Sequence, residues 1–312
     1  MRRVVLPLVI ALAVPAQQAL AVVVLENHNV HVEVGDFGDS DCLKIRADNS
    51  IDWSNDWLQR FMSFVSINEG WVQPVDEAHF FVDAPVHHID PVWPYTVPYR
   101  TASVVSNSTI KIVYSTAVRP MTDPGIGKGF ARWDVYADIY NLTDEPVSLK
   151  YYWYLNLDYG GFSAFDSARM EAVEGGLQMH QAKGLLDISP AYFIDTMSPS
   201  RWEIDDYPHL YDKLWWATGP VDLLYGRDEG LGQVFGPYDV TAAYQHDFTL
   251  EPKGCHMLYL SPESDSPVPE PSGLVVWGLG IGLAAAAGWL GGRRRNRSSR
   301  ARREACSDFL PP

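Results

Sequence analysis

The chain has 312 residues, of which 46% are hydrophobic and 20% are charged. Between two terminal segments of different character, residues 22–270 contain 15 Lys and Arg against 37 Asp and Glu, a net charge of −22 with histidine neutral. So acidic an exterior repels phosphate backbones and excludes nucleic acid as a partner. The apolar content still suffices for a substantial core, so the chain is not a disordered acidic tract.

Residues 1–21 have the features of a cleaved secretory signal peptide. Two arginines precede an apolar run, and Ala19 and Ala21 supply the small residues that signal peptidase requires at its cleavage site. The run contains a proline and two glutamines and is too short to span a bilayer comfortably, which argues against an uncleaved anchor. The sequence therefore predicts export, with signal peptidase as the first processing partner.

Residues 22–260 are predicted to form one all-β ectodomain. Apolar and polar residues alternate with a period of two, turn residues recur every ten or so positions, and no long segment has helical periodicity. Residues 22–34, 108–118 and 255–260 show the pattern well. We expect an antiparallel β-sandwich, although two smaller domains would also fit the length.

A glycine-containing turn at residues 35–41 concentrates three carboxylates, Asp36, Asp39 and Asp41. Calcium prefers oxygen ligands of this kind, so the turn is a candidate calcium site. It lacks the EF-hand spacing, however, and aspartates that bond to the local backbone would explain the composition equally well. Two further segments, residues 107–109 and 141–143, match the glycosylation sequon, and we predict that both are turns.

The segment 130–161 reads as two strands whose odd-numbered residues are apolar in both halves. A hairpin with a five-residue loop at 141–145 would bring these odd residues onto one face, because opposite positions then sum to an even number. Trp133 would face Trp153 in this register. The sequence therefore predicts a 130–160 hairpin that buries its odd residues.

The same register would collect the polar and aromatic residues on the second face of the hairpin. An aromatic face with flanking carboxylates suits sugar rings, although a solvated outer face of a sandwich has the same composition. The candidate ligand face comprises Arg132, Asp134, Tyr136, Tyr152 and Tyr154.

Two of the three cysteines, Cys42 and Cys255, lie near the two ends of the predicted ectodomain, where the compartment is oxidising. A disulfide between them would close most of the domain into one loop and stabilise it by about 4 kcal/mol in the chain-entropy model. Two separate buried thiols are the alternative, since the sequence gives no distance between the residues.

The C-terminal region has three parts in a fixed order. Residues 261–272 are rich in proline, serine and acids and are predicted to be an extended tether. Residues 273–292 contain no charge and are long enough, at about 1.5 Å per residue, to span a bilayer as a transmembrane helix. Residues 293–312 form a basic tail that is expected to stay in the cytoplasm. The basic cluster that stops translocation is Arg293, Arg294, Arg295 and Arg297.

This order resembles the PEP-CTERM sorting signal of Gram-negative bacteria, with Val268, Pro269, Glu270 and Pro271 as the motif. The resemblance covers about 30 residues at the C-terminus, and the chain departs from it by continuing through residues 298–312 after the basic cluster. It implies that an exosortase recognises the motif, cuts near it, and releases or transfers the protein. The expected localisation is the inner membrane for the precursor, then the cell surface or the medium.

By this resemblance, we expect a non-enzymatic surface or extracellular-matrix protein associated with exopolysaccharide and biofilm. No catalytic motif is recognisable in the sequence, and the only cofactor it indicates is calcium. The first alternative is a carbohydrate-binding or carbohydrate-active protein that uses the tyrosine-rich face of the hairpin. The second is a single-pass membrane protein that is never processed. Two carboxylates that converge in one cleft would favour an enzyme.

Overall fold

The structure is a computed structural model that describes residues 21–27, 30–40, 42–45, 58–89, 100–122, 129–157, 166–183, 192–197 and 199–264. These residues form a mostly β structure with antiparallel strand pairings and one short helix, α1 (His209–Trp215). The expectation of an all-β fold is confirmed. The predicted signal peptide, the transmembrane helix, the basic tail and most of the tether lie outside the described residues. Within the described part of the chain, no helix is long and apolar enough to cross a membrane.

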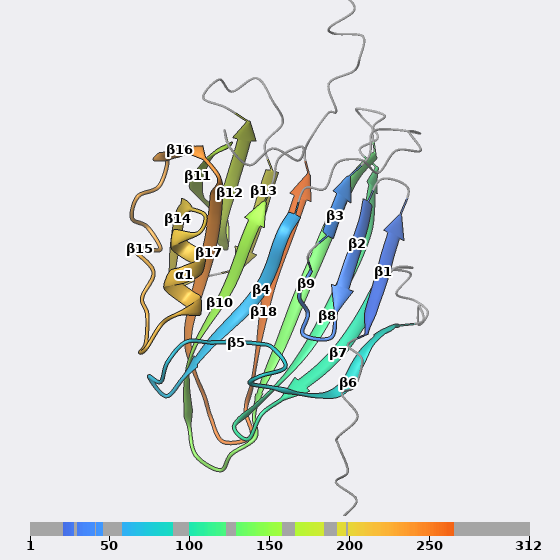
Figure 1. The fold of residues 1–312 in the computed structure, drawn as a ribbon, viewed down its shortest axis with the longest axis vertical. Coiled ribbons are helices and arrows are strands. Elements are labelled where there is room, and N and C mark those ends of the chain that lie inside the picture. The colour runs from blue at the N-terminus through green and yellow to red at the C-terminus, as the bar shows by residue number, and fades with distance from the viewer. Residues whose placement is uncertain are drawn as a thin grey trace, which may run out of the picture.

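The strands make two large sheets, whose long strands run roughly along the long axis of the molecule in Figure 1. The six-stranded sheet contains, in spatial order, β15 (Tyr225–Gly226), β14 (Arg201–Asp206), β17 (Val240–Leu250), β10 (Val147–Leu157), β4 (Leu58–Ile67) and β5 (Gln73–Pro74). The nine-stranded sheet contains β16 (Val234–Tyr238), β11 (Asp166–Val173), β12 (Gly176–Lys183), β13 (Tyr192–Met197), β18 (Cys255–Ser264), β9 (Gly129–Asn141), β8 (Ile110–Thr122), β7 (Arg100–Ser106) and β6 (Phe81–His88).

A third, three-stranded sheet consists of β1 (Val22–Asn27), β2 (Val30–Gly35) and β3 (Cys42–Ile45). Its apolar side chains, Leu25 and Val32 among them, join the same core as the two large sheets. A backbone bridge between Ser40 and Phe61 ties the segment before β3 to β4. The three sheets therefore enclose one continuous hydrophobic interior, as expected of a sandwich.

Aromatic side chains from both large sheets meet in that interior. Phe61 of β4 lies between two tryptophans, with its ring centroid 5.1 Å from that of Trp133 on β9 and 5.3 Å from that of Trp153 on β10. All three side chains are buried. The prediction that the odd residues of both strands are buried is confirmed at these positions, and the contacts join the two layers.

The predicted 130–160 hairpin is wrong. β9 pairs with β8 and β18 in the nine-stranded sheet, whereas β10 pairs with β4 and β17 in the six-stranded sheet. The connection between them crosses from one layer to the other, and Asn141 anchors it by donating hydrogen bonds from Nδ2 to the carbonyls of Glu145, Leu250 and Glu251. Strands in facing sheets both turn their apolar residues inward, so the odd-residue pattern is the same as in a hairpin.

The predicted disulfide is also wrong, because Cys255 is a free, exposed thiol. Cys255 pairs with Tyr140, at the end of the sandwich where β9 leads into β10. Cys42 lies two residues after Ser40, which forms the bridge to Phe61. Phe61 pairs with Leu155 of β10, and Leu155 is eight residues from Val147, where β10 begins at the end of the sandwich that holds Cys255. Eight strand residues span roughly 26 Å, so the two cysteines lie toward opposite ends of the sandwich, far beyond the Cα separation of about 7 Å that a disulfide allows.

Candidate functional site

The structure divides the predicted ligand face between the two outer surfaces of the sandwich. Asp134 and Tyr136 lie on β9, with Arg132 on the same strand, and the side chain of Arg132 is outside the described ones. The hydroxyls of Tyr259 and Ser261 donate to Asp134 Oδ1 at 2.7 and 3.0 Å. Asp134 is thereby held within its own sheet.

Tyr152 and Tyr154 lie on the outer side of β10, in the other sheet. Both are buried beneath α1, where they pack with Leu210 and Leu214 of that helix. Burial raises the pKa of both phenols, and the Tyr152 hydroxyl donates to the carbonyl of Val221. The five predicted residues therefore form no common ligand platform, because their two strands belong to different sheets.

Asp36 bonds to the backbone. Its Oδ1 accepts the N–H of Val86 at 2.6 Å, and its Oδ2 accepts the N–H of Ala21 at 2.8 Å. The side chain is buried, so the carboxylate joins three distant segments of the chain. Asp39 lies close to Gly35 in the same turn, and Asp41 lies outside the described residues. Long-range hydrogen bonds from the backbone therefore engage both oxygens of Asp36.

A different group has the spacing of metal ligands within the described part of the chain. One oxygen or nitrogen from each of Asp205, Asp206 and His209 lies within 4.8 Å of the others. His209 Nδ1 is already 2.6 Å from Asp206 Oδ1, and Asp205 Oδ1 accepts the backbone N–H of Asp206. The three residues are at least partly exposed and satisfy each other, as acidic surface groups often do without a metal.

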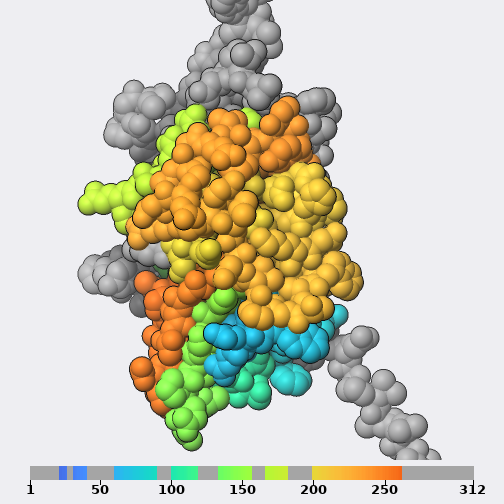
Figure 2. All heavy atoms as spheres, turned by 90° about the vertical axis from the view of Figure 1, so that its left-hand side faces the viewer, coloured from blue at the N-terminus to red at the C-terminus, as the bar shows by residue number. Residues whose placement is uncertain are grey.

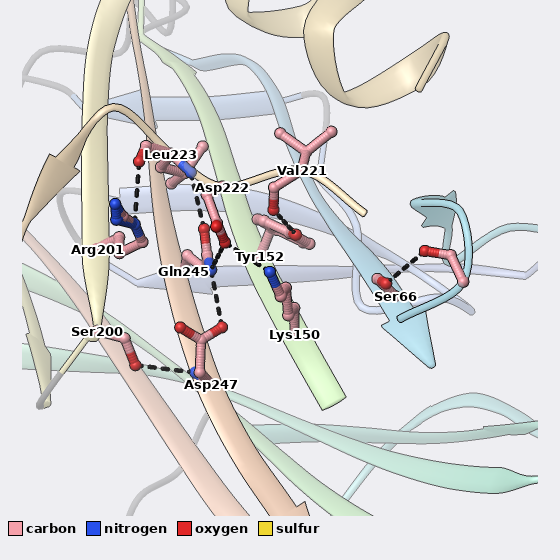
Figure 3. Close-up of polar contacts among 11 residues, drawn as sticks. Ser66, Lys150, Tyr152, Ser200, Arg201, Val221, Asp222, Leu223, Gln245 and Asp247 are labelled. Carbon is pink, nitrogen blue, oxygen red and sulfur yellow. Dashed lines mark hydrogen bonds and ion pairs between the residues drawn. The ribbon is translucent and has the colours of Figure 1, made fainter. Parts of the chain in front are cut away.

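A polar network on the outer face of the six-stranded sheet is centred on Gln245 of β17. Its Oε1 accepts the N–H of Leu223 at 2.8 Å, and its Nε2 donates to Asp247 Oδ1 at 2.8 Å and to Asp222 Oδ1 at 3.1 Å. Figure 3 shows Gln245 between these two carboxylates, with Lys150 reaching Asp222 from β10. The network fastens residues 221–223 to the sheet.

Asp222 and Asp247 are the converging carboxylates that a glycosidase would need. Both Oδ1 atoms bond to one nitrogen, so they are no farther apart than about 6 Å; carboxyl groups of catalytic pairs lie about 5–5.5 Å apart in retaining and about 6.5–9.5 Å apart in inverting enzymes. A general acid must hold its proton near neutral pH. The hydrogen bonds from Lys150 and then Gln245 instead lower the pKa of Asp222. Asp222 loses its proton more easily than an ordinary carboxyl group and is therefore unsuited to the general-acid role.

The second candidate is a cavity of about 470 Å³ where the two sheets meet at one end of the sandwich. Its volume lies within the roughly 300–1,000 Å³ of small-molecule sites. Figure 2 shows the segment around β5 in blue and cyan at the surface, below the yellow of α1. The residues that line the cavity come from the end of β4, from β5, and from the β4–β5, β5–β6 and β7–β8 connections: Ile67, Gly70, Trp71, Gln73, Ala78, His79, Asn107, Ser108 and Thr109.

Trp71 is the large aromatic side chain of this cavity and is 67% exposed. It follows a tight turn in which Asn68 and Glu69 both adopt positive φ angles, of 51° and 58°. The turn is fixed because Asn68 exchanges hydrogen bonds with Ser148 of β10, and Ser66 donates to the carbonyl of Gly70. An indole held in solvent beside a cavity presents an apolar face to a ligand.

Two polar side chains of the cavity are oriented by their neighbours. Asn107 Oδ1 accepts the N–H groups of Thr109 and Ile110 at 2.9 Å each, which leaves its Nδ2 as the group that a ligand would meet. His79 Nδ1 lies 2.7 Å from Asp76 Oδ1, which leaves Nε2 for a ligand. The predicted turn at residues 107–109 is therefore confirmed, and it contributes directly to the cavity. Such preorganised groups reduce the entropy lost on binding.

Little in the sequence indicates this cavity. Trp71 stands outside any clear alternation, directly after the turn residues Asn68, Glu69 and Gly70, and that position was the available signal. Three of its polar neighbours, Asn107, Ser108 and Thr109, begin 36 residues later, on the connection between two strands of the other sheet. Only the tertiary packing brings the two connections together.

No protein-family model and no curated protein matches the chain. Among solved structures it is similar to a bacterial glucoamylase complexed with acarbose, with a TM-score of 0.50 and 10% identity over 78% of this chain and 32% of that one. A polysaccharide lyase is similar with a TM-score of 0.39 and 12% identity, over 80% of this chain and 33% of that one. A galactose mutarotase-like protein from Lactobacillus casei is similar with a TM-score of 0.32 and 12% identity, over 78% of this chain and 100% of that one. The chain spans about a third of the first two, and at these identities the likeness concerns the fold alone.

Proposed function

We propose that the protein is an exported carbohydrate-binding protein that holds a sugar chain in the Trp71 cavity without cleaving it. The observation that carries this proposal is the exposed indole of Trp71 beside a 470 Å³ cavity lined by amide, hydroxyl and imidazole groups. Sugars present apolar ring faces edged by hydroxyls, so an aromatic surface with neutral hydrogen-bonding groups complements them. The glucoamylase likeness agrees with a carbohydrate-related role, although it covers only a third of that enzyme.

The positions of the carboxylates support binding without hydrolysis. Asp222 is held by Lys150 and Gln245 in the network on the outer face of the six-stranded sheet. Among the residues that the structure describes, those that line the Trp71 cavity include no carboxylate. Glycoside hydrolysis needs two carboxyl groups across one substrate site. The described residues of the cavity therefore supply recognition groups without the pair that cleaves a glycosidic bond.

Export completes the proposal. The signal peptide and the resemblance to the PEP-CTERM signal support delivery to the cell surface by an exosortase, where exopolysaccharide is the sugar that the protein would meet. The ectodomain would then display its cavity outside the cell after the tether at 261–272 is cut. Both processing steps rest on sequence features that lie outside the described residues.

The test is a glycan array with the full-length protein in detergent, followed by titration of the best ligand. Changing Trp71 to Ala should weaken binding by about ten- to a hundredfold, because removing a central aromatic anchor costs roughly 1–3 kcal/mol. Trp216→Ala is the matched control, since Trp216 is equally exposed, at 72%, but does not line the cavity. Equal loss in both variants, or no glycan bound by the wild-type protein, would overturn the proposal.

A further inference from the structure

We infer that the Trp71 cavity selects uncharged sugar chains and excludes acidic ones such as uronates, an inference that rests on the proposed function. The residues lining the cavity are uncharged apart from His79, and the imidazole of His79 already pairs with Asp76. Proteins bind sugar carboxylates through guanidinium or ammonium groups, which form charge-assisted hydrogen bonds. The lining residues within the described part of the chain supply neither group.

Carboxylates flank the cavity along the β4–β5 and β5–β6 connections. Glu69 precedes Gly70, and Asp76 and Glu77 precede Ala78, so each lies within two residues of a residue that lines the cavity. The sequence from 61 to 99 contains no Lys or Arg. Glu69 and Glu77 are exposed, so their negative charge adds to the potential that a ligand meets as it approaches this part of the surface.

The cations on neighbouring strands are engaged elsewhere. Lys111 follows the 107–109 turn on β8, and its Nζ lies 4.5 Å from the centre of the Tyr140 ring. Lys150 lies on β10 beside the strand that ends at Ile67, and its Nζ bonds to Asp222 at 2.6 Å. A uronate would have to separate one of these cations from its partner to gain an opposite charge. The cavity therefore offers an acidic sugar repulsion without compensation.

The experiment measures binding of neutral oligosaccharides and of uronates that match them in length and linkage. The probes are β-1,4-linked glucose and mannose chains and the corresponding glucuronate and mannuronate chains, titrated into the full-length protein in detergent at low and high salt. We expect the neutral chains to bind at least about tenfold more tightly at low salt, and the difference to shrink at high salt because screening weakens the repulsion.

A double variant identifies the charges responsible. Glu69→Gln with Glu77→Gln should bring the uronate affinity closer to the neutral one and leave the neutral affinity within about twofold. Glu174→Gln with Asp228→Asn is the matched control, because it removes the same charge from exposed turns away from the cavity. It should preserve the discrimination.

The outcomes separate the two proposals. Uronates that bind as tightly as neutral chains at low salt would overturn the selectivity and leave the proposed function intact. Discrimination that is equal in the two double variants would also overturn it, because the local carboxylates would then not be its cause. Failure of every probe, neutral or acidic, to bind would overturn the proposed function and the selectivity with it.

Discussion

Replacing Gln245 with Met tests whether the polar network stabilises the outer layer of the sandwich. The Gln245 side chain is completely buried, and Met has a similar length but neither donates nor accepts as an amide does. Leaving the buried N–H of Leu223 without its acceptor costs about 1–3 kcal/mol. The two lost bonds to Asp222 and Asp247 add roughly 1 kcal/mol, because both carboxylates are exposed enough to recover water.

The expected loss of unfolding free energy is therefore about 2–4 kcal/mol, which lowers the midpoint of thermal unfolding by roughly 4–16 °C in a domain of this size. Calorimetry on the full-length protein in detergent measures it. Lys150→Met is the control. The side chains of Lys150 and Asp222 are 24% and 56% exposed, and salt bridges between exposed side chains contribute about 0–1 kcal/mol to stability. A Gln245→Met midpoint within 2 °C of wild type, or no lower than that of Lys150→Met, would refute the structural role of the network.

Three further predictions concern other parts of the chain. Asp36→Asn should cost about 1–3 kcal/mol of stability, because a neutral amide replaces the carboxylate that accepts the buried N–H of Val86. A chelator should leave the wild-type midpoint unchanged, and a drop with chelator would restore the calcium hypothesis. Burial lowers the pKa of His246 from 6.5 to about 3. As the pH falls, the unfolded chain therefore binds a proton at this histidine before the folded chain does. The contribution of the neutral histidine to stability is fully present above pH 6.5 and is lost as the pH falls toward 3. His246→Phe should reduce the fall of the urea-unfolding midpoint between pH 6.5 and pH 3, and an unchanged slope would contradict the role given to His246. Glu270→Ala should trap the precursor in the inner membrane, while the wild-type mature form ends near residues 269–272; intact masses showing a full-length C-terminus with and without the exosortase would refute sorting.

Alternation along the chain was enough to predict which side chains enter the core. The burial of Trp133 and Trp153 follows from their odd positions in two strands of period two, and a strand shifted by one residue would expose them. The turns at 107–109 and 141–143 were equally predictable, because Asn side chains bond to the backbone two residues ahead. These features depend on neighbours in the sequence, so the sequence alone determined them.

Strand partners were decided by the tertiary structure. β9 and β10 both bury their odd-numbered residues, as the two strands of a hairpin would. They nevertheless pair with strands distant in sequence, β9 with β18 and β10 with β4. Alternation with a period of two shows which side of a strand is buried. The pattern is the same whether the next strand in sequence pairs with this strand in one sheet or lies in the facing sheet across the core. The same limit applies to the Trp71 cavity, since its indole and the amide of Asn107 come from connections in different sheets. Alternation is a local property, whereas the pairing of strands and the meeting of connections depend on how the whole core closes.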